Sequence, residues 1–249
     1  IRFKSFFRFL FTKRIYKIIE DYPILYIHMP EAVLGFLLRK KKKIIYHLHG
    51  CDNPLKFSTY PFFRNKIFQI LYEKFITSTI IKKVDFLITI NKDCENYIKK
   101  FKIIKNSKNI PNLVNSNIFY PVDRDICRQK LNLNTKSEVY LMVCRIEEVK
   151  GIQHIIKVFN KLIKINSNIV LLIAGSGTML NKYKSEVKNL KMDKNIIFLG
   201  MVEYEKLPYY YNAADCYVLA SYSEGTPMSI LESMSVGIPI ISSNVGNIN

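Results

Sequence analysis

Short apolar runs alternate with amphipathic segments along most of the chain, and this alternation limits the possible folds more than any other feature. It is typical of βαβ units, in which parallel strands form a sheet covered by helices. In the second half, the pattern predicts five strands at 138–144, 168–174, 196–199, 216–220 and 238–242, and four helices at 152–165, 179–190, 205–213 and 228–236. Such an order suits an open, doubly wound parallel sheet that binds ligands at the carboxyl ends of its strands.

The first half shows the same alternation less regularly. It predicts strands at 24–28, 44–49 and 84–90, and helices at 4–20, 64–82 and 92–102. A polar stretch containing Pro111, Asn112, Asn115 and Pro121 then interrupts the pattern, and one helix at 123–133 follows it. We interpret the stretch as a crossover, which predicts a first α/β domain at 1–120, a linker at 121–136 and a second domain at 137–249.

Composition narrows the class of protein. No apolar run approaches the roughly 18 residues that a membrane-spanning helix needs. The five cysteines are widely spaced and include no Cys-x-x-Cys pair, which favours reduced thiols in the cytoplasm over a disulfide framework or a zinc site. The sequence shows no cluster with metal-ligand spacing, so we expect no metal site.

The positive charge is unevenly distributed. Residues 1–136 carry 27 Lys and Arg against 10 Asp and Glu, whereas residues 137–249 carry 11 against 10. This asymmetry predicts an anionic partner for the first half: a membrane surface, a phosphorylated lipid or a nucleic acid. The alternative is that A/T-rich codons, which would also explain the 36 Ile and 21 Asn, have simply enriched solvated lysines.

The strongest local motif follows the predicted strand 216–220 and reads Glu-Gly-Thr-Pro-Met-Ser-Ile-Leu-Glu, from Glu224 to Glu232. We expect Glu224 in a loop and Glu232 inside the next helix, both facing the strand ends. Gly225 allows close backbone approach to a ligand, and Pro227 suits the first turn of a helix, whose free N–H groups favour an anion such as a diphosphate. Alone, the motif fits a capped helix with two solvated carboxylates equally well.

Two further elements favour a ligand site. Arg145 and Lys150 follow the predicted strand 138–144, which places two cations where a phosphate would bind. The predicted strand 168–174 runs into Gly175-Ser176-Gly177, a turn of small residues that also allows a ligand to approach the backbone.

Three segments, in this order and each after a strand, resemble the retaining nucleotide-sugar glycosyltransferases of family four: VCRIEEVKG, LLIAGSG and EGTPMSILESMSVGIPIISSNVG. Cys144 stands where that family usually has Gly. The resemblance implies a GT-B fold, an α/β architecture of two Rossmann-like doubly wound parallel-sheet domains that face each other across a cleft. It also implies a nucleoside-diphosphate sugar as donor and no cofactor or metal ion.

The resemblance also implies roles for individual residues. Arg145 and Lys150 would bind the donor diphosphate, Glu224 the transferred sugar, and Glu232 the ribose. His49, at the end of the predicted strand 44–49, would lie near the reacting carbon and the acceptor. The other donor-binding residues would be Gly175, Gly177, Phe198, Leu199, Gly200, Met201, Gly225, Thr226, Pro227 and Met228, of which Phe198–Met201 would line the base pocket.

Both ends of the chain depart from the family pattern. Nothing in IRFKSFFRFL matches the Gly-rich loop that opens such enzymes, and the chain begins with Ile and stops seven residues after the final predicted strand. We therefore expect a fragment that lacks its first strands and its closing helices. In the crossover segment IPNLVNSNIFYP, Asn112 matches the family, whereas Leu113 and Asn115 replace Gly and Asp.

The function implied by the resemblance is retaining hexosyl transfer to a saccharide or lipid-linked acceptor, in surface polysaccharide synthesis at the cytoplasmic face of a membrane. The alternatives are a GT-B epimerase or phosphorylase, an inactive truncated fragment, and a nucleic-acid-binding module. We expect no nucleic-acid partner, because the aromatic residues near the start of the chain form an amphipathic helical pattern rather than an RNA-binding motif.

Overall fold

The computed structural model describes residues 21–28, 33, 42–50, 65–101, 106–246 and 248. The chain forms two compact units. The boundary between them along the chain lies between Pro111 and Asn112, inside the segment interpreted as the crossover. Phe119, which the sequence assigns to the first domain, is buried in the core of the second unit. The predicted helix at 4–20 lies outside the described residues.

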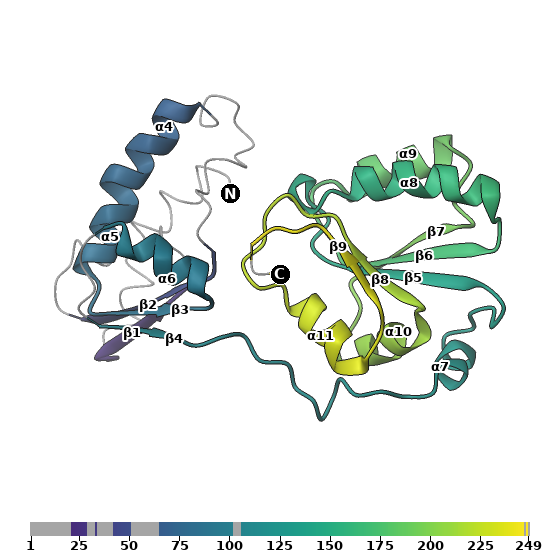
Figure 1. Cartoon of the computed structure of the whole chain (residues 1–249), viewed down its shortest axis with the longest axis horizontal. Helices are drawn as coiled ribbons and strands as arrows, with labels where there is room; N and C mark the ends of the chain where they lie inside the picture. The colour runs from purple at the N-terminus through teal and green to yellow at the C-terminus, as the bar shows by residue number, and fades with distance from the viewer. Residues whose placement is uncertain are drawn as a thin grey trace. The chain divides into compact units, whose positions relative to one another are not determined.

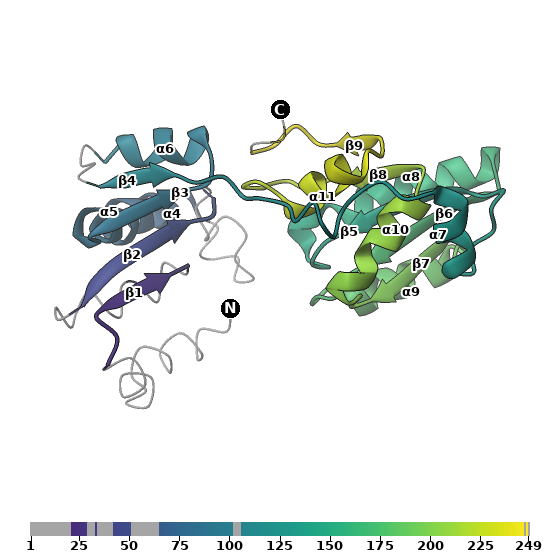
Figure 2. The same ribbon diagram turned by 90° about the horizontal axis from the view of Figure 1, so that it is seen from below.

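The first unit contains a parallel sheet in the order β1-β2-β3-β4, seen strand by strand in Figure 2. Its described elements are β1 (Ile24–Ile27), β2 (Lys43–Leu48), α4 (Lys66–Leu71), the π-helical segment η3 (Tyr72–Thr77), α5 (Ser78–Lys83), β3 (Phe86–Thr89), α6 (Lys92–Lys99) and β4 (Ser107–Asn109). The predicted helix at 64–82 is therefore a continuous run of α4, η3 and α5 with a wider turn in its middle.

β4 is a strand that the sequence does not predict. Its residues, Ser107, Lys108 and Asn109, are polar and carry no apolar alternation, because β4 lies at the edge of the sheet. It pairs in parallel with β3, and the residue that follows it, Ile110, donates its backbone N–H to Thr89 O at 2.8 Å.

Side chains alternate between the two faces of this sheet, as they must along a strand. One face is buried against α5 and α6, and the core formed there includes Leu25, Tyr46, Leu87, Ile80 and Ile98. The opposite face carries the alternate residues, among them the exposed Tyr26 and the partly buried His47.

The second unit contains a five-stranded parallel sheet in the order β7-β6-β5-β8-β9. Its elements are α7 (Arg124–Lys130), β5 (Glu138–Val143), the 3₁₀ turn η4 (Glu148–Lys150), α8 (Ile152–Ile165), β6 (Ile169–Ala174), α9 (Leu180–Asn189), β7 (Ile196–Gly200), the 3₁₀ turn η5 (Tyr204–Lys206), α10 (Leu207–Ala213), β8 (Cys216–Leu219), α11 (Met228–Val236) and β9 (Ile240–Ser242). In Figure 1, α8 and α9 cover one face of the sheet, and α10 and α11 cover the other. This is the doubly wound arrangement that the sequence predicts.

Proline explains two of the differences from the predicted bounds in this unit. The predicted helix at 205–213 begins as a 3₁₀ turn, and the α-helix starts only at Leu207, with Pro208 in its first turn. The predicted strand at 238–242 is shortened to Ile240–Ser242, because Pro239 has no N–H to donate, although its carbonyl still accepts a hydrogen bond from Tyr217 N.

The strand order places two loops at a topological switch point. From β5 the chain adds β6 and β7 on one side, then returns to add β8 and β9 on the other. β5 and β8 are neighbours, with Tyr140 paired to Cys216 and Leu141 to Tyr217. In open α/β sheets, ligands bind outside the carboxyl ends of the two strands where the order reverses. The loops after β5 and β8 are therefore the place to look for a site.

Candidate active site

The loop after β5 is fixed against the end of β8. Gly151, which follows the 3₁₀ turn Glu148–Lys150, adopts a left-handed conformation with φ of 65°. A Cβ added there would lie 1.9 Å from the carbonyl oxygen of Ala220, so only glycine fits. A backbone hydrogen bond from Tyr222 N to Val149 O, at 2.8 Å, joins the same two loops.

This contact brings together two of the predicted site residues. Lys150 Nζ lies 2.6 Å from Glu224 Oε1, although 74 positions separate the two residues. Both side chains are largely buried, with exposed fractions of 14% and 8%. A buried ion pair is costly to desolvate and is weak support for stability. The pair lies where open α/β sheets bind ligands, and its contact with a ligand stays a prediction.

Glu224 has a second fixed partner. Ser221 Oγ donates a hydrogen bond of 2.5 Å to the same oxygen, Oε1, and Ser221 is itself held through its carbonyl by Ser243 Oγ at 2.6 Å. Within the described part of the chain, Oε2 of Glu224 makes no hydrogen bond. One oxygen of the carboxylate therefore fixes its position, and the other can accept from a ligand hydroxyl.

The start of α11 offers backbone donors next to Glu224. The helix begins at Met228, and Pro227 occupies the preceding capping position rather than the first turn that the sequence predicts. No side chain caps this end, and its first turn has no acidic residue. The first-turn N–H groups of a helix attract anions. Gly246 packs against the backbone of Glu224, because a Cβ added at Gly246 would lie 2.0 Å from Glu224 O.

Glu232 lies inside α11 and is only 5% exposed. Its Oε2 accepts a 2.6 Å hydrogen bond from the hydroxyl of Tyr211, a fully buried residue of α10. Burial raises the pKa of Glu232, and the hydrogen bond from Tyr211 offsets part of that rise. Its binding to a ribose stays a prediction. In the structure, one oxygen of this carboxylate already accepts a hydrogen bond from Tyr211.

Gly175 and Gly177 lie in the turn after β6, where neighbouring backbone requires both glycines. An added Cβ would lie 1.9 Å from Cys144 O at Gly175 and 2.2 Å from Ile146 O at Gly177. Gly175 also has a φ of 134°, a region that side-chain-bearing residues avoid. The glycines thus allow the β5 and β6 loops to pack together, and their contact with a ligand stays a prediction.

The remaining predicted donor residues lie at the edges of this site. Arg145 is exposed directly after Cys144, at the carboxyl end of β5. Phe198 and Leu199 are partly buried near the end of β7, and Met201 is 79% exposed. Burial raises the pKa of the Cys144 thiol to about 12, so at neutral pH it is uncharged beside the two cations.

Tyr217 is a positioning residue that sequence reasoning missed. Its side chain is fully buried, and its hydroxyl lies 2.7 Å from Ser229 Oγ and 3.2 Å from Val143 O. With one proton to donate, it donates to Val143 O and accepts from Ser229. This links the end of β5 to the first turn of α11. In the sequence, Tyr217 is an aromatic residue inside a short apolar strand. This pattern predicts an ordinary core residue, so it does not indicate the role of the hydroxyl.

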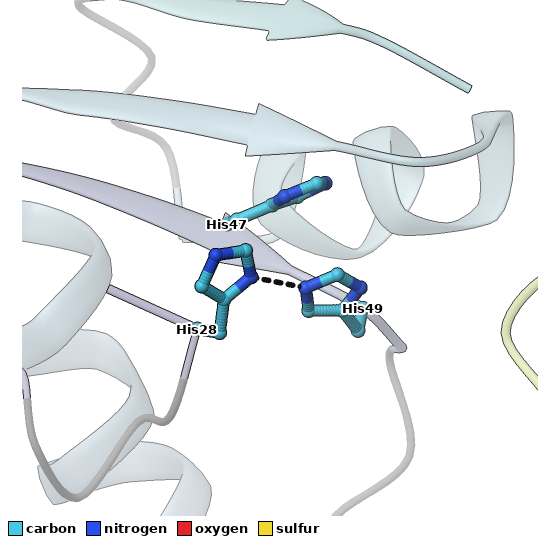
Figure 3. A group of neighbouring side chains, drawn as sticks. All are labelled: His28, His47 and His49. Atoms are coloured by element: carbon cyan, nitrogen blue, oxygen red, sulfur yellow. Dashed lines mark hydrogen bonds between the residues drawn. The ribbon is translucent and has the colours of Figure 1, made fainter. Parts of the chain in front are cut away.

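In the first unit, the sequence predicts His49 as the last residue of a strand, whereas β2 ends at Leu48 and His49 follows it directly. His49 belongs to a cluster with two other histidines (Figure 3). His28 Nδ1 lies 2.6 Å from His49 Nε2, and the rings of His47 and His49 have centroids 4.1 Å apart. Burial, followed by the charges of His49 and His28, lowers the pKa of His47 to about 4. Burial, followed by His28, also lowers the pKa of His49. The imidazole of His47 is therefore neutral at pH 7.

Residues 123–249 match the family model described as glycosyl transferases group 1, which covers half of the chain. The chain belongs to this family. The matched residues contain Arg145, Lys150, Glu224 and Glu232, so the switch-point site lies inside the domain that defines the family.

One curated protein and two solved structures illustrate what the chain is similar to. The chain is 34% identical over 114 residues to the alpha-monoglucosyldiacylglycerol synthase of Streptococcus pneumoniae, an alignment that covers 46% of this chain and 26% of that enzyme. Among solved structures, a sucrose-phosphate synthase from Thermosynechococcus elongatus superposes with a TM-score of 0.79 and 21% identity, over 99% of this chain and 62% of that one. The HepE protein of Anabaena, solved with UDP-glucose, gives a TM-score of 0.74 and 16% identity, over 94% and 63%.

These superpositions establish the fold. The predicted GT-B class, with two parallel-sheet α/β domains, is confirmed. This chain spans less than two thirds of the length of each of these three relatives.

Proposed function

We propose that this protein transfers a hexosyl group from a nucleoside-diphosphate sugar to a saccharide or lipid-linked acceptor, with retention of anomeric configuration. The proposed setting is surface polysaccharide synthesis (lipopolysaccharide, capsule or exopolysaccharide) at the cytoplasmic face of the plasma membrane. One observation carries the proposal: Lys150 and Glu224 meet at the switch point of a glycosyl transferases group 1 domain. The HepE structure with UDP-glucose supports the class of donor.

Lys150 and Arg145 would stabilise the leaving diphosphate. The ammonium of Lys150 has three N–H donors, of which one faces Glu224, so two can reach phosphate oxygens. Arg145 is exposed and offers a planar, bidentate donor. When the bond from the anomeric carbon to the diphosphate oxygen breaks, its electron pair moves to that oxygen, and two preplaced cations lower the energy of this charge. The proposed transfer therefore requires no metal ion.

Glu224 and the start of α11 would hold the sugar. Oε2 of Glu224 would accept from a sugar hydroxyl, while Lys150 and Ser221 hold Oε1. The backbone of Gly225, Thr226 and Met228 would contribute further polar contacts. Glu232 would receive the ribose hydroxyls, with Tyr211 fixing one of its oxygens.

Retention would follow if the acceptor oxygen attacks from the face that the diphosphate leaves. The proton of the acceptor hydroxyl would pass to the leaving phosphate oxygen, which keeps atoms and charge balanced. His49 is proposed to contact the acceptor. Retention rests on the resemblance of the segment 224–246 to retaining enzymes.

The donor and the stereochemistry can be tested together. The protein would be supplied with UDP-glucose, UDP-galactose, UDP-N-acetylglucosamine and GDP-mannose, each with a lipid-linked saccharide acceptor. We expect one donor to yield a product with the donor's own anomeric configuration, as read from the anomeric proton coupling by NMR. An inverted product would refute the mechanism, and turnover of none of the donors would refute the function.

We also propose that the first unit binds an anionic membrane surface. No helix among the described residues is both long and apolar enough to span a bilayer. The run from α4 into η3 nevertheless exposes four apolar side chains at helical spacing, with Lys66 and Lys74 exposed beside them: Ile67, Ile70, Leu71 and Phe75. An apolar helix face flanked by lysines is typical of helices that lie in the membrane interface.

Vesicle flotation tests this part of the proposal. Binding should be stronger on anionic than on neutral vesicles and should fall with added salt. Replacing both Ile70 and Phe75 with Ser should weaken binding roughly tenfold or more, because each apolar side chain contributes about 1.5–3 kcal/mol when fully buried. Ile165→Ser is the matched control, since Ile165 is 84% exposed at the end of a helix in the second unit. Equal binding to neutral and anionic vesicles would contradict the proposal.

A further inference from the structure

Three histidines meet on one face of the first sheet. Ile27 of β1 pairs with Tyr46 of β2, so the next step along both parallel strands brings His28 beside His47. His47 and His49 are two positions apart and therefore project to the same face. Figure 3 shows the three rings gathered at the carboxyl ends of these strands.

The ring nitrogens are close enough to share one ion. One nitrogen from each residue lies within 4.8 Å of the other two. His28 Nδ1 and His49 Nε2 are only 2.6 Å apart, which makes a hydrogen bond between the two rings. The proton in this bond can move to the other nitrogen of its own ring by a change of tautomer, which leaves both facing nitrogens with lone pairs.

His47 provides the second observation. Its Nδ1 lies 2.6 Å from the hydroxyl of Tyr26, whereas its Nε2 is buried and has no hydrogen-bond partner among the described residues. A buried polar atom without a partner is unusual and needs an explanation. Metal-binding histidines commonly use one nitrogen for the ion and the other for a hydrogen bond that fixes the ring. His47 has this arrangement, with Tyr26 holding Nδ1 and Nε2 left for a ligand.

We propose that His28, His47 and His49 bind a divalent transition-metal ion of the zinc class. Three imidazole nitrogens suit Zn²⁺, Co²⁺, Ni²⁺ or Cu²⁺, whereas Mg²⁺ and Ca²⁺ require oxygen ligands that these three side chains do not supply. Three protein ligands leave a fourth position for water or for an oxygen of a bound molecule. Two nitrogens about 2.0–2.1 Å from a tetrahedral ion lie about 3.3 Å apart. Binding would therefore lengthen the distance between His28 Nδ1 and His49 Nε2, now 2.6 Å, by about 0.7 Å.

This site goes beyond the proposed glycosyl transfer, which assigns only His49 a contact, to the acceptor, and which requires no metal ion. Metal affinity can be measured without any donor sugar. The competing explanation is that the three rings only stack and hydrogen-bond to one another. The two explanations differ in what Zn²⁺ or Co²⁺ would do to the untagged protein.

The first experiment uses the wild-type protein, free of any histidine tag and with its thiols alkylated. The chain has four histidines, so its imidazole proton NMR signals are few. One equivalent of Co²⁺ should shift or broaden three of these signals and leave that of His154 unchanged, while excess Mg²⁺ should change none. Uniform weak broadening of all four signals, or no change at one equivalent, would overturn the proposal.

Variants then assign the ligands by Zn²⁺ titration calorimetry, with circular dichroism as a check on folding. His28→Asn, His47→Asn and His49→Asn should each weaken binding by more than about 100-fold, whereas Tyr26→Phe should cost roughly 10-fold, as removal of a ligand's hydrogen-bond partner does. His154→Gln is the matched control and should bind like wild type. Wild-type affinity in any of the three histidine variants would overturn the proposal.

Discussion

Replacing Lys150 with alanine is expected to lower kcat by about 100-fold or more, with Glu224→Ala reducing it to a similar extent. Lys150 is the cation that the fold places at the switch point, 2.6 Å from Glu224 Oε1. If it stabilises charge on the leaving diphosphate, its removal acts on the transition state and lowers kcat and kcat/KM together. Steady-state kinetics with the preferred donor measures both constants.

This change also leaves a largely buried carboxylate without its cation, so folding must be checked in the same samples. Breaking a buried pair by removing one partner costs about 3–5 kcal/mol, with Ser221 still donating to Glu224 to moderate the loss. Glu224→Gln combined with Lys150→Met removes both charges and should restore stability but not activity. Lys157→Ala, at an exposed lysine of α8, is the matched control. Normal turnover in a folded Lys150→Ala variant would show that the site is misplaced.

Replacing Arg128 with methionine is expected to lower the free energy of unfolding by about 3–5 kcal/mol. Arg128 of α7 is 2% exposed, and its guanidinium forms three hydrogen bonds: to Ala213 O at 2.9 Å, to Thr135 O at 2.8 Å and to Asp215 Oδ2 at 2.5 Å. Its loss removes the donor to two carbonyl groups and one of the donors to Asp215, which keeps its hydrogen bonds from Arg124 and from Val139 N, where α7 packs against α10. Urea unfolding, followed by far-UV circular dichroism, gives the free energy directly.

Arg124 provides a control with the same partner. Its Nη1 lies 2.7 Å from Asp215 Oδ1, but its side chain is 55% exposed. Exposed ion pairs contribute about 0–1 kcal/mol, so Arg124→Ala should destabilise the protein by no more than that. Equal effects of the two substitutions would mean that Asp215, rather than burial of Arg128, determines the stability of this contact.

The sequence predicts the fold of the second unit well, because its apolar runs and helical periodicity are long. The helices α8 and α11 have the bounds that the sequence predicts. In α8 the buried residues Ile152, Ile156 and Phe159 recur at helical spacing. In contrast, β4 is a three-residue edge strand without apolar residues, and η3 differs from an α-helix by a turn width that composition does not reveal.

The candidate site is predictable as a set of residues but not as a set of contacts. Arg145, Lys150 and Glu224 can be chosen from the sequence because each follows a predicted strand. That Lys150 pairs with Glu224 depends on β5 lying beside β8, which only the strand order shows. Likewise, His28 lies 21 positions before His49, and the parallel pairing of β1 with β2 brings the two together.

Donor binding to this switch-point site tests the central claim most directly. Calorimetric titration of the wild-type protein with the four donor sugars should show one donor binding at one equivalent. Lys150→Met, whose apolar side chain has a similar length, should weaken that donor's affinity by about tenfold or more, because it removes a charge-assisted contact to the diphosphate. Unchanged affinity in a folded Lys150→Met protein would contradict the assignment of this site to a nucleotide sugar.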